Sequence, residues 1–200
     1  MDGDGVDEAV FRGEGDALET KLILGGYDVL AVSGTLVATD VGAMLDPSWS
    51  GFALRAIELD GDGYADFATH AGDETESIVQ AGLSSGDLGT LSAMLPIAEL
   101  HGAEPGDEFG AEVSTAATST GDAATRLAVS THTSDFTYGA GEVYLYDGRV
   151  VAAGGAFEIS DALFVIAGVT GLAPAGDLDG DGTTDLVAGI GLIYIFTDLW

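Results

Sequence analysis

The chain has 200 residues and a formal net charge of −29 at pH 7, with 34 acidic residues against 5 lysines and arginines. So acidic a protein repels the phosphates of nucleic acids and of anionic membranes, which excludes nucleic-acid binding. Hydrophobic residues still make up 46% of the chain and the mean hydropathy is +0.30, so we expect a packed protein and not a disordered one. The longest uncharged run, 162–176, is shorter than the ~20 apolar residues of a transmembrane helix, and we expect no membrane insertion in this segment.

An acidic phrase recurs along the chain: DGDGVDEAVFRG at 2–13, ELDGDGYADFATH at 58–70 and DLDGDGTTDLVAG at 177–189. Each copy places oxygen ligands at alternate positions and a glycine where the chain must turn, which is typical of a calcium-binding loop. The predicted ligands are Glu58, Asp60, Asp62, the carbonyl of Tyr64 and Asp66; Asp177, Asp179, Asp181, the carbonyl of Thr183 and Asp185; and Asp2, Asp4 and Glu8. Whether the first, clipped copy binds calcium stays open, because its first ligand would precede Met1.

The EF-hand shares the first six loop positions but differs later. An EF-hand takes a bidentate Glu at position twelve and lies between helices, whereas position twelve is Thr69 in one loop and Ala188 in the other. Both loops run directly into short apolar segments that favour strands. We therefore expect the Asp at position nine to close the site, and the loop to join strands.

A further copy at 118–130, TSTGDAATRLAVS, keeps the spacing but has lost its ligands. The carboxylates of positions one, three and nine are replaced by Thr118, Thr120 and Arg126, so we expect no calcium there. Arg126 either binds Asp122 in place of the cation or is an ordinary surface residue.

The copies are evenly spaced. Residues at the fifth loop position, Asp4, Asp62, Asp122 and Asp181, are separated by 58, 60 and 59 residues. A fixed period of this size indicates an array of small supersecondary units. Alternation and glycine breaks predict about four short strands per period, as in a propeller blade. In the third period these strands are 127–131, 142–146, 150–157 and 163–169.

The residues resemble the FG-GAP repeats of integrin α-subunit propellers and of many secreted bacterial proteins. GDEFGAEVSTAA at 106–117 is similar to the FG strand, with Phe109 and Gly110 in the named positions. GAGEVYLYDG at 139–148 and GLIYIFTD at 191–198 are similar to the strand that follows the GAP element. The resemblance implies an all-β fold, a calcium-binding β-propeller of FG-GAP-type four-stranded blades. The FG slot before the second loop departs from the pattern, since it holds Trp49 and Ser50.

The period divides the chain into repeats at 1–57, 58–117, 118–176 and an incomplete 177–200, which is about 3.4 blades. Closed propellers have roughly 4 to 8 blades. We therefore expect a partial propeller that is a fragment of a longer chain; self-assembly into a ring is the alternative.

The resemblance implies an extracellular or cell-surface module that acts as an adhesion or recognition scaffold for a protein or glycan ligand, with calcium in a structural role and no enzymatic activity. Extracellular calcium modules bind at roughly 10⁻⁴ to 10⁻³ M, which suits such a location. The alternative is the propeller domain of a secreted polysaccharide-degrading lyase or hydrolase. The sequence leaves the ligand and the oligomeric state open.

Three other patterns have competing interpretations. The match to G-x-S-x-G at 82–86 is a hydrolase nucleophile only if a helix follows a strand and a sharp turn. His70 and His132 occupy nearly equivalent repeat positions and either bind zinc or are ordinary imidazoles. The aromatic residues Trp49, Tyr138, Tyr144 and Tyr146 line a binding face or, as is more common on strands, belong to the core.

Overall fold

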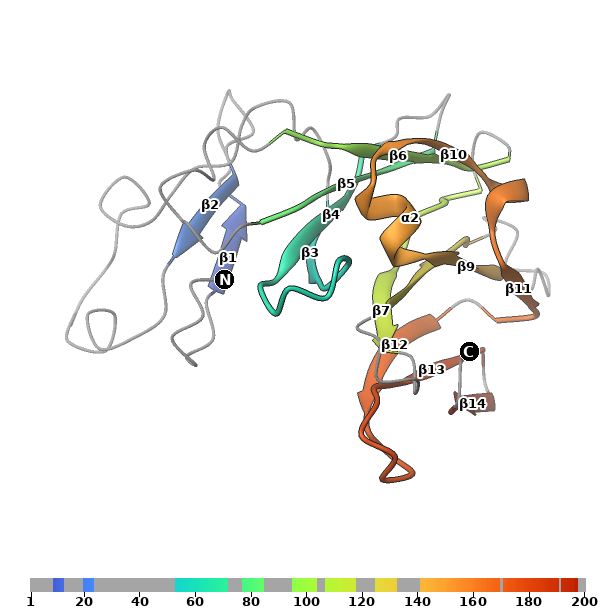
Figure 1. The fold of residues 1–200 in the computed structure, drawn as a ribbon. Coiled ribbons are helices and arrows are strands. Elements are labelled where there is room, and N and C mark those ends of the chain that lie inside the picture. Colours follow the sequence, from blue (N-terminus) through green and yellow to red (C-terminus); the bar gives the residue numbers. More distant parts are fainter. Residues whose placement is uncertain are drawn as a thin grey trace.

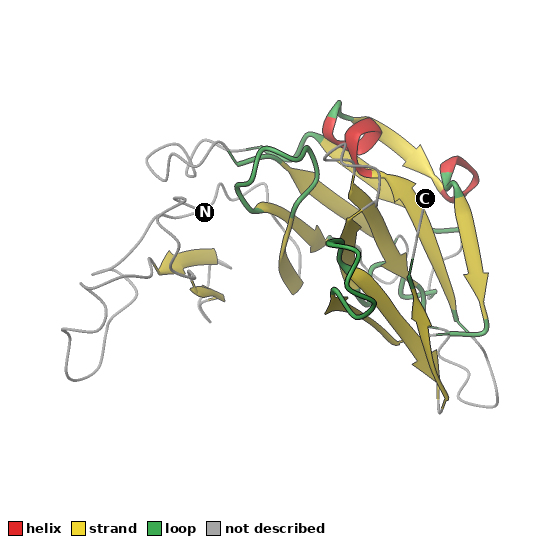
Figure 2. Ribbon diagram, turned by 60° about the horizontal axis from the view of Figure 1, so that its bottom comes forward, coloured by secondary structure: helices red, strands yellow, loops and turns green. Residues whose placement is uncertain are grey.

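The computed structural model describes residues 9–12, 20–23, 53–71, 77–84, 95–103, 107–117, 125–132, 141–169, 171–190 and 192–197. Within these residues the secondary structure consists mainly of strands, arranged in four sheets that we number I to IV in chain order (Figures 1 and 2). The predicted all-β class is therefore confirmed.

Successive antiparallel strands form each sheet. Sheet I pairs β1 (Ala9–Arg12) with β2 (Thr20–Ile23). Sheet II contains β3 (Ala53–Ile57), β4 (Asp66–His70), β5 (Ile78–Gly82) and β6 (Ala98–His101). Sheet III contains β7 (Val113–Ala117), β8 (Thr125–Ser130), β9 (Glu142–Asp147) and β11 (Phe164–Ala167). Sheet IV contains β12 (Gly171–Gly176), β13 (Asp185–Ile190) and β14 (Leu192–Phe196).

The sequence repeat is visible in this arrangement. The predicted loop at 58–66 joins β3 to β4 in sheet II, and the loop at 177–185 joins β12 to β13 in sheet IV. In the sequence, the degenerate copy begins at the corresponding position of sheet III, after β7 and before β8. The predicted strands 127–131, 142–146 and 163–169 correspond to β8, β9 and β11. Sheets II, III and IV therefore each begin with the strand that precedes the loop copy in the sequence.

The predicted strand at 150–157 is wrong. This stretch forms the helix α2 (Gly148–Ala152) and then β10 (Gly155–Glu158), which pairs in parallel with β6 of sheet II. The Asp147 side chain starts the helix by accepting a hydrogen bond from the Arg149 N–H (3.0 Å). Gly154, with φ of 85°, ends it in a conformation that few other residues adopt. A short 3₁₀ turn, η2 (Ile159–Asp161), leads on to β11.

The FG pair lies in a turn before β7, not in a strand. Phe109 is fully buried, and its ring packs edge-on against Tyr144 with ring centres 5.9 Å apart. Gly110 has φ of 92°, and a Cβ at this position would lie 2.5 Å from Cγ2 of Val79 in sheet II. The pair therefore brings sheet III close to sheet II, which a larger residue at position 110 would prevent.

Sheet III is covered on both faces, because neighbouring residues of a strand point in opposite directions. Leu127 and Tyr146 face each other across β8 and β9 and belong to the core between sheets II and III. Ala128 and Leu145, the next pair, belong to the core between sheets III and IV. The first strands of these sheets also meet, β3 with β7 and β7 with β12 (Figure 1). The sheets are thus stacked side by side with their first strands together.

We expect Leu145→Ala to lower the free energy of unfolding by about 2–5 kcal/mol, because it opens a cavity between sheets III and IV. The matched control is Leu192→Ala on β14, where the side chain is 67% exposed and the cost should be below about 0.5 kcal/mol. Urea unfolding at low protein concentration measures both. Equal costs for the two variants would contradict the described packing.

Candidate metal sites

The loop at 58–66 is closed by carboxylates that accept hydrogen bonds from its own backbone. Glu58 accepts from the N–H groups of Gly61 (2.7 Å) and Gly63 (3.1 Å), and Asp60 accepts from the N–H of Asp62 (3.0 Å). The two glycines have φ of 82° and 88°, which residues with a side chain rarely adopt. The sequence therefore folds locally around Glu58 because glycine stands at loop positions four and six.

Asp66 ties this loop to the neighbouring strand. It is fully buried, and its two oxygens accept from the N–H of Leu59 (2.9 Å) and from the N–H of Ser84, just beyond β5 (2.8 Å). Burial raises the pKa of Asp66 to about 6, although both hydrogen bonds lower it and the nearby Asp60 raises it further. The two hydrogen bonds therefore do not fully offset the desolvation of the charged carboxylate, and a bound cation would stabilise that charge.

The loop at 177–185 repeats this network position for position. Its carboxylates accept from the following N–H groups: Asp177 from Gly180 (2.6 Å) and Gly182 (2.9 Å), Asp179 from Asp181 (3.1 Å), Asp181 from Thr183 (2.8 Å) and Asp185 from Leu178 (2.7 Å). Gly180 and Gly182 again have positive φ, 85° and 90°. Two segments far apart in the sequence thus form the same loop.

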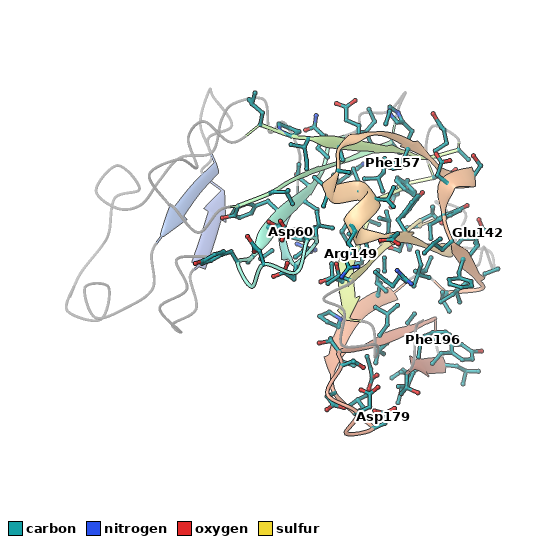
Figure 3. All side chains as sticks on the ribbon, in the orientation of Figure 1. Asp60, Glu142, Arg149, Phe157, Asp179 and Phe196 are labelled. Carbon is teal, nitrogen blue, oxygen red and sulfur yellow. The ribbon has the colours of Figure 1, made fainter. Side chains whose placement is uncertain are left out.

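In each loop three carboxylates converge. One oxygen each of Glu58, Asp60 and Asp66 lies within 4.8 Å of the others, and the same holds for Asp177, Asp179 and Asp185. Calcium takes oxygen ligands at about 2.3–2.6 Å, so two ligands on opposite sides of one ion lie about 4.6–5.2 Å apart. The spacing therefore fits a calcium ion. Figure 3 shows the two loops at the labelled residues Asp60 and Asp179.

The fifth-position carboxylates, Asp62 and Asp181, accept hydrogen bonds from the loop backbone. Asp62 and Asp181 do not belong to the converging groups, and each accepts from the N–H at position seven, Tyr64 (2.8 Å) and Thr183 (2.8 Å). The hydrogen bonds from Thr183 lower the pKa of Asp181. That the carboxylates of Asp62 and Asp181 and the carbonyls of Tyr64 and Thr183 are ligands stays a prediction.

The other two copies lie largely outside the described residues. Asp2, Asp4 and Glu8 are all outside them, as are 118–124 of the degenerate copy. Arg126 is described, and its guanidinium lies 3.5 Å from the carboxylate of Asp147, the residue opposite it on β9. The strand register therefore provides a partner for Arg126 that the sequence had not indicated.

The two loops differ at their second position. Leu59 is fully buried in the core between sheets II and III, and its carbonyl accepts from Oγ1 of Thr125 on β8 (2.9 Å). Gly148 permits this approach, since a Cβ there would lie 2.5 Å from Oγ1 of Thr125. The equivalent Leu178 is 53% exposed. Nothing in the sequence indicated that Thr125 and Gly148 anchor this loop. The one available sign was the leucine at position two of both loops, an apolar residue in an otherwise acidic segment.

The other candidates have structural roles where they are described. Ser84 of the G-x-S-x-G match is buried and its backbone supports Asp66. His132 Nδ1 lies 3.1 Å from Oε2 of Glu108, and burial lowers the pKa of His70. Tyr144 and Tyr146 are buried in the core, which confirms the core interpretation. Among the described residues, only the two acidic loops bring three possible metal ligands together.

A comparison with models of known protein families gives no match, and a comparison with curated proteins gives none either. None of the helices in the described part of the chain reaches the length and apolarity needed to span a bilayer.

Asp66 predicts how stability without calcium depends on pH. Its folded-state pKa of about 6 lies above the ordinary 3.8, so between these values the folded protein binds more protons than the unfolded one. Its contribution to stability therefore falls as the pH rises through this window. In chelator, we expect Asp66→Asn to remove part of the difference in melting temperature between pH 5 and pH 7.

The control for this experiment is Asp161→Asn, at an exposed position. Asn at position 66 offers one acceptor oxygen to two N–H donors, so the variant is less stable at every pH. The quantity to compare is therefore the slope of the melting temperature against pH. A slope equal to that of the unsubstituted protein would show that Asp66 does not titrate in this window.

Proposed function

We propose that this protein is a calcium-binding segment of a β-propeller, in which calcium holds the loop between the first and second strands of a sheet. The observation that supports this most is the matching set of backbone hydrogen bonds within the two acidic loops, each with three converging carboxylates. A tight turn needs no such convergence. Carboxylates this close repel one another, and a divalent cation removes the repulsion.

The stacking of the sheets supports the propeller. A blade is an antiparallel four-stranded sheet whose first strand lies nearest the axis, with further blades on either side. Sheets II and III each contain four antiparallel strands, and β7 adjoins both β3 and β12 (Figure 1). Together with the 59-residue repeat, this favours a partial propeller of FG-GAP type, with about 3.4 blades in the chain.

Calcium in this proposal is structural. Glu58, Asp60 and Asp66 would hold one ion, and Asp177, Asp179 and Asp185 the other. Burial also raises the pKa of Glu58, with Asp62 and Asp60 raising it further. These carboxylates resist being ionised together in the absence of a cation. Cation binding is therefore coupled to folding, so the metal and the fold stabilise each other.

We further propose that the module acts outside the cell or at its surface, as an adhesion or recognition scaffold for a protein or glycan. Loops of this kind suit the calcium concentrations found there. We prefer this function to that of a polysaccharide-degrading enzyme because described arginines are engaged within the structure: Arg55 lies 3.3 Å from Glu112, and Arg126 3.5 Å from Asp147. The Arg126 pair lies within sheet III, between β8 and β9, and both guanidinium groups already face a carboxylate.

Calorimetric titration tests the calcium sites. We expect two binding events with dissociation constants of roughly 10⁻⁴ to 10⁻³ M. Asp60→Asn and Asp179→Asn should each remove one event, because the amide keeps the oxygen that accepts the loop hydrogen bond and loses the charge. Calcium at about 100 times the dissociation constant should stabilise the fold by about 2.7 kcal/mol per site.

The matched control is Glu99→Gln, an exposed carboxylate on β6 that belongs to neither loop. It should leave both binding events and the melting temperature in calcium unchanged. If the unsubstituted protein binds no calcium and melts at the same temperature in calcium and in chelator, the loops are ordinary turns and the proposed function fails.

Arrays of glycans and of extracellular matrix proteins test the recognition role. We expect binding to a restricted set of array members in calcium and its loss in chelator, because calcium orders the loops that join the strands. The double variant Asp60→Asn, Asp179→Asn should lose the same signals. Turnover of a polysaccharide in place of retained binding would favour the enzymatic alternative.

A further inference from the structure

The segment that joins β9 to β11 encloses a pocket. This segment leaves sheet III at the end of β9, forms α2, pairs with sheet II through β10 and returns to sheet III through η2 (Figure 1). Residues of β9, α2, β10 and η2 line a pocket of about 360 Å³. Pockets that hold small organic molecules have volumes of roughly 300–1,000 Å³. None of the described lining residues belongs to an acidic loop, so the pocket is separate from the candidate metal sites.

The walls of the pocket are held by the protein's own hydrogen bonds. The N–H of Gly155 donates to the carbonyl of Ile97 (2.9 Å) where β10 joins sheet II. The Asp147 side chain caps α2, and the Asp161 side chain closes η2 by accepting from the N–H of Glu158 (2.8 Å). The pocket is therefore formed before a ligand arrives, and binding does not have to order its walls.

One part of the lining is apolar. Val151 is fully buried, and Phe157 packs against the core between sheets II and III. Val150 and Leu163 are 54% and 47% exposed, so these side chains lie where the pocket meets water. A ligand with an apolar body would cover both of them, and removing apolar surface from water favours binding.

The charged residues among the described lining are both acidic, Asp147 and Asp161. The charge of Asp147 is partly offset, because the guanidinium of Arg126 lies 3.5 Å from it. Asp161 is exposed, and only one of its oxygens has a hydrogen-bond partner among the described residues. Its other oxygen can accept from a ligand, and such a bond is stronger when the donor is a cation.

The field inside the pocket opposes negative charge. Tyr146 is only 1% exposed, and its hydroxyl donates a long hydrogen bond to the carbonyl of Glu158 (3.4 Å). Burial raises the pKa of Tyr146, and Tyr144, Asp161 and Glu158 raise it further. Two carboxylates thus act on a buried hydroxyl that lines the pocket. A field that opposes an anion at Tyr146 favours a cation beside it.

We propose that this pocket binds a small organic cation, whose apolar body lies against Val150 and Leu163 and whose ammonium group donates a hydrogen bond to Asp161. A glycan would bury many hydroxyl groups, and the lining has too few polar groups to satisfy them. The negative field disfavours an anionic ligand. The inference goes beyond calcium binding and does not rest on it, because the acidic loops take no part in the lining.

NMR titration of the methyl resonances tests this with probes that share one apolar body: phenylbutylamine, phenylbutanol and phenylbutyrate. We expect the amine, which is protonated at neutral pH, to bind with a dissociation constant of roughly 10⁻⁴ to 10⁻³ M. The alcohol should bind about tenfold more weakly, and the carboxylate should not bind. Resonances of Val150, Val151 and Leu163 should shift, while those of the exposed Leu192 and Ile193 should not.

Two variants separate the charge from the apolar contact. Asp161→Asn keeps an oxygen for the N–H of Glu158 and loses the charge, so it should weaken the amine about tenfold and leave the alcohol unchanged. Leu163→Ala should weaken the amine and the alcohol alike, by about fivefold. The matched controls are Glu99→Gln and Leu192→Ala, at exposed positions outside the lining, and neither should change binding.

The titrations are run in calcium and repeated in chelator, with circular dichroism to show that each variant is folded. The proposal is overturned if neither phenylbutylamine nor hexylamine binds to the folded protein. Equal affinities for the amine and the alcohol would also overturn it, as would equal effects of Asp161→Asn and Glu99→Gln. Shifts of Leu192 and Ile193 as large as those of Val150 would show that the amine coats any apolar surface of an acidic protein.

Discussion

Packing of sheet III against sheets II and IV is the interaction on which the described structure depends. Alternate residues of β8 and β9 serve two cores at once, so Leu127 contributes to the core with sheet II and Ala128 to the core with sheet IV. A sheet of three or four short strands buries too little on one side to be stable alone, as in other repeat proteins. The helix α2, which follows β9, takes part in this packing, because its Val151 lies in the core between sheets II and III.

The acidic loops depend on the same packing. The buried Asp66 joins the loop at 58–66 to β5, and Leu59 joins it to sheet III through Thr125. A cation held by this loop would stabilise contacts between sheets as well as the turn itself. The loop at 177–185 has the same internal hydrogen bonds, but its Leu178 is exposed. The two sites should therefore respond differently when the packing of the sheets changes.

Several differences between expectation and structure arise from contacts between distant residues. Val150 and Val151 favour a strand by composition, yet they lie in α2, because Asp147 caps the helix and Val151 packs into the core between sheets II and III. The following strand, β10, joins sheet II and not its own sheet. Arg126 pairs with Asp147, a partner defined by the register of β8 and β9. Apart from the Asp147 cap, local sequence contains none of this information.

The sequence alone determined the all-β class, the repeat and the two complete acidic loops, because period, alternation and glycine placement are local properties of the chain. It also identified Glu58, Asp60 and Asp66, and their counterparts Asp177, Asp179 and Asp185, as residues that come together. Only the tertiary structure decided which face of each sheet is buried, which loop is anchored to a neighbour and which apolar surface is left open. Those outcomes depend on sheets that are distant in sequence, and burial is a property of the whole assembly of strands.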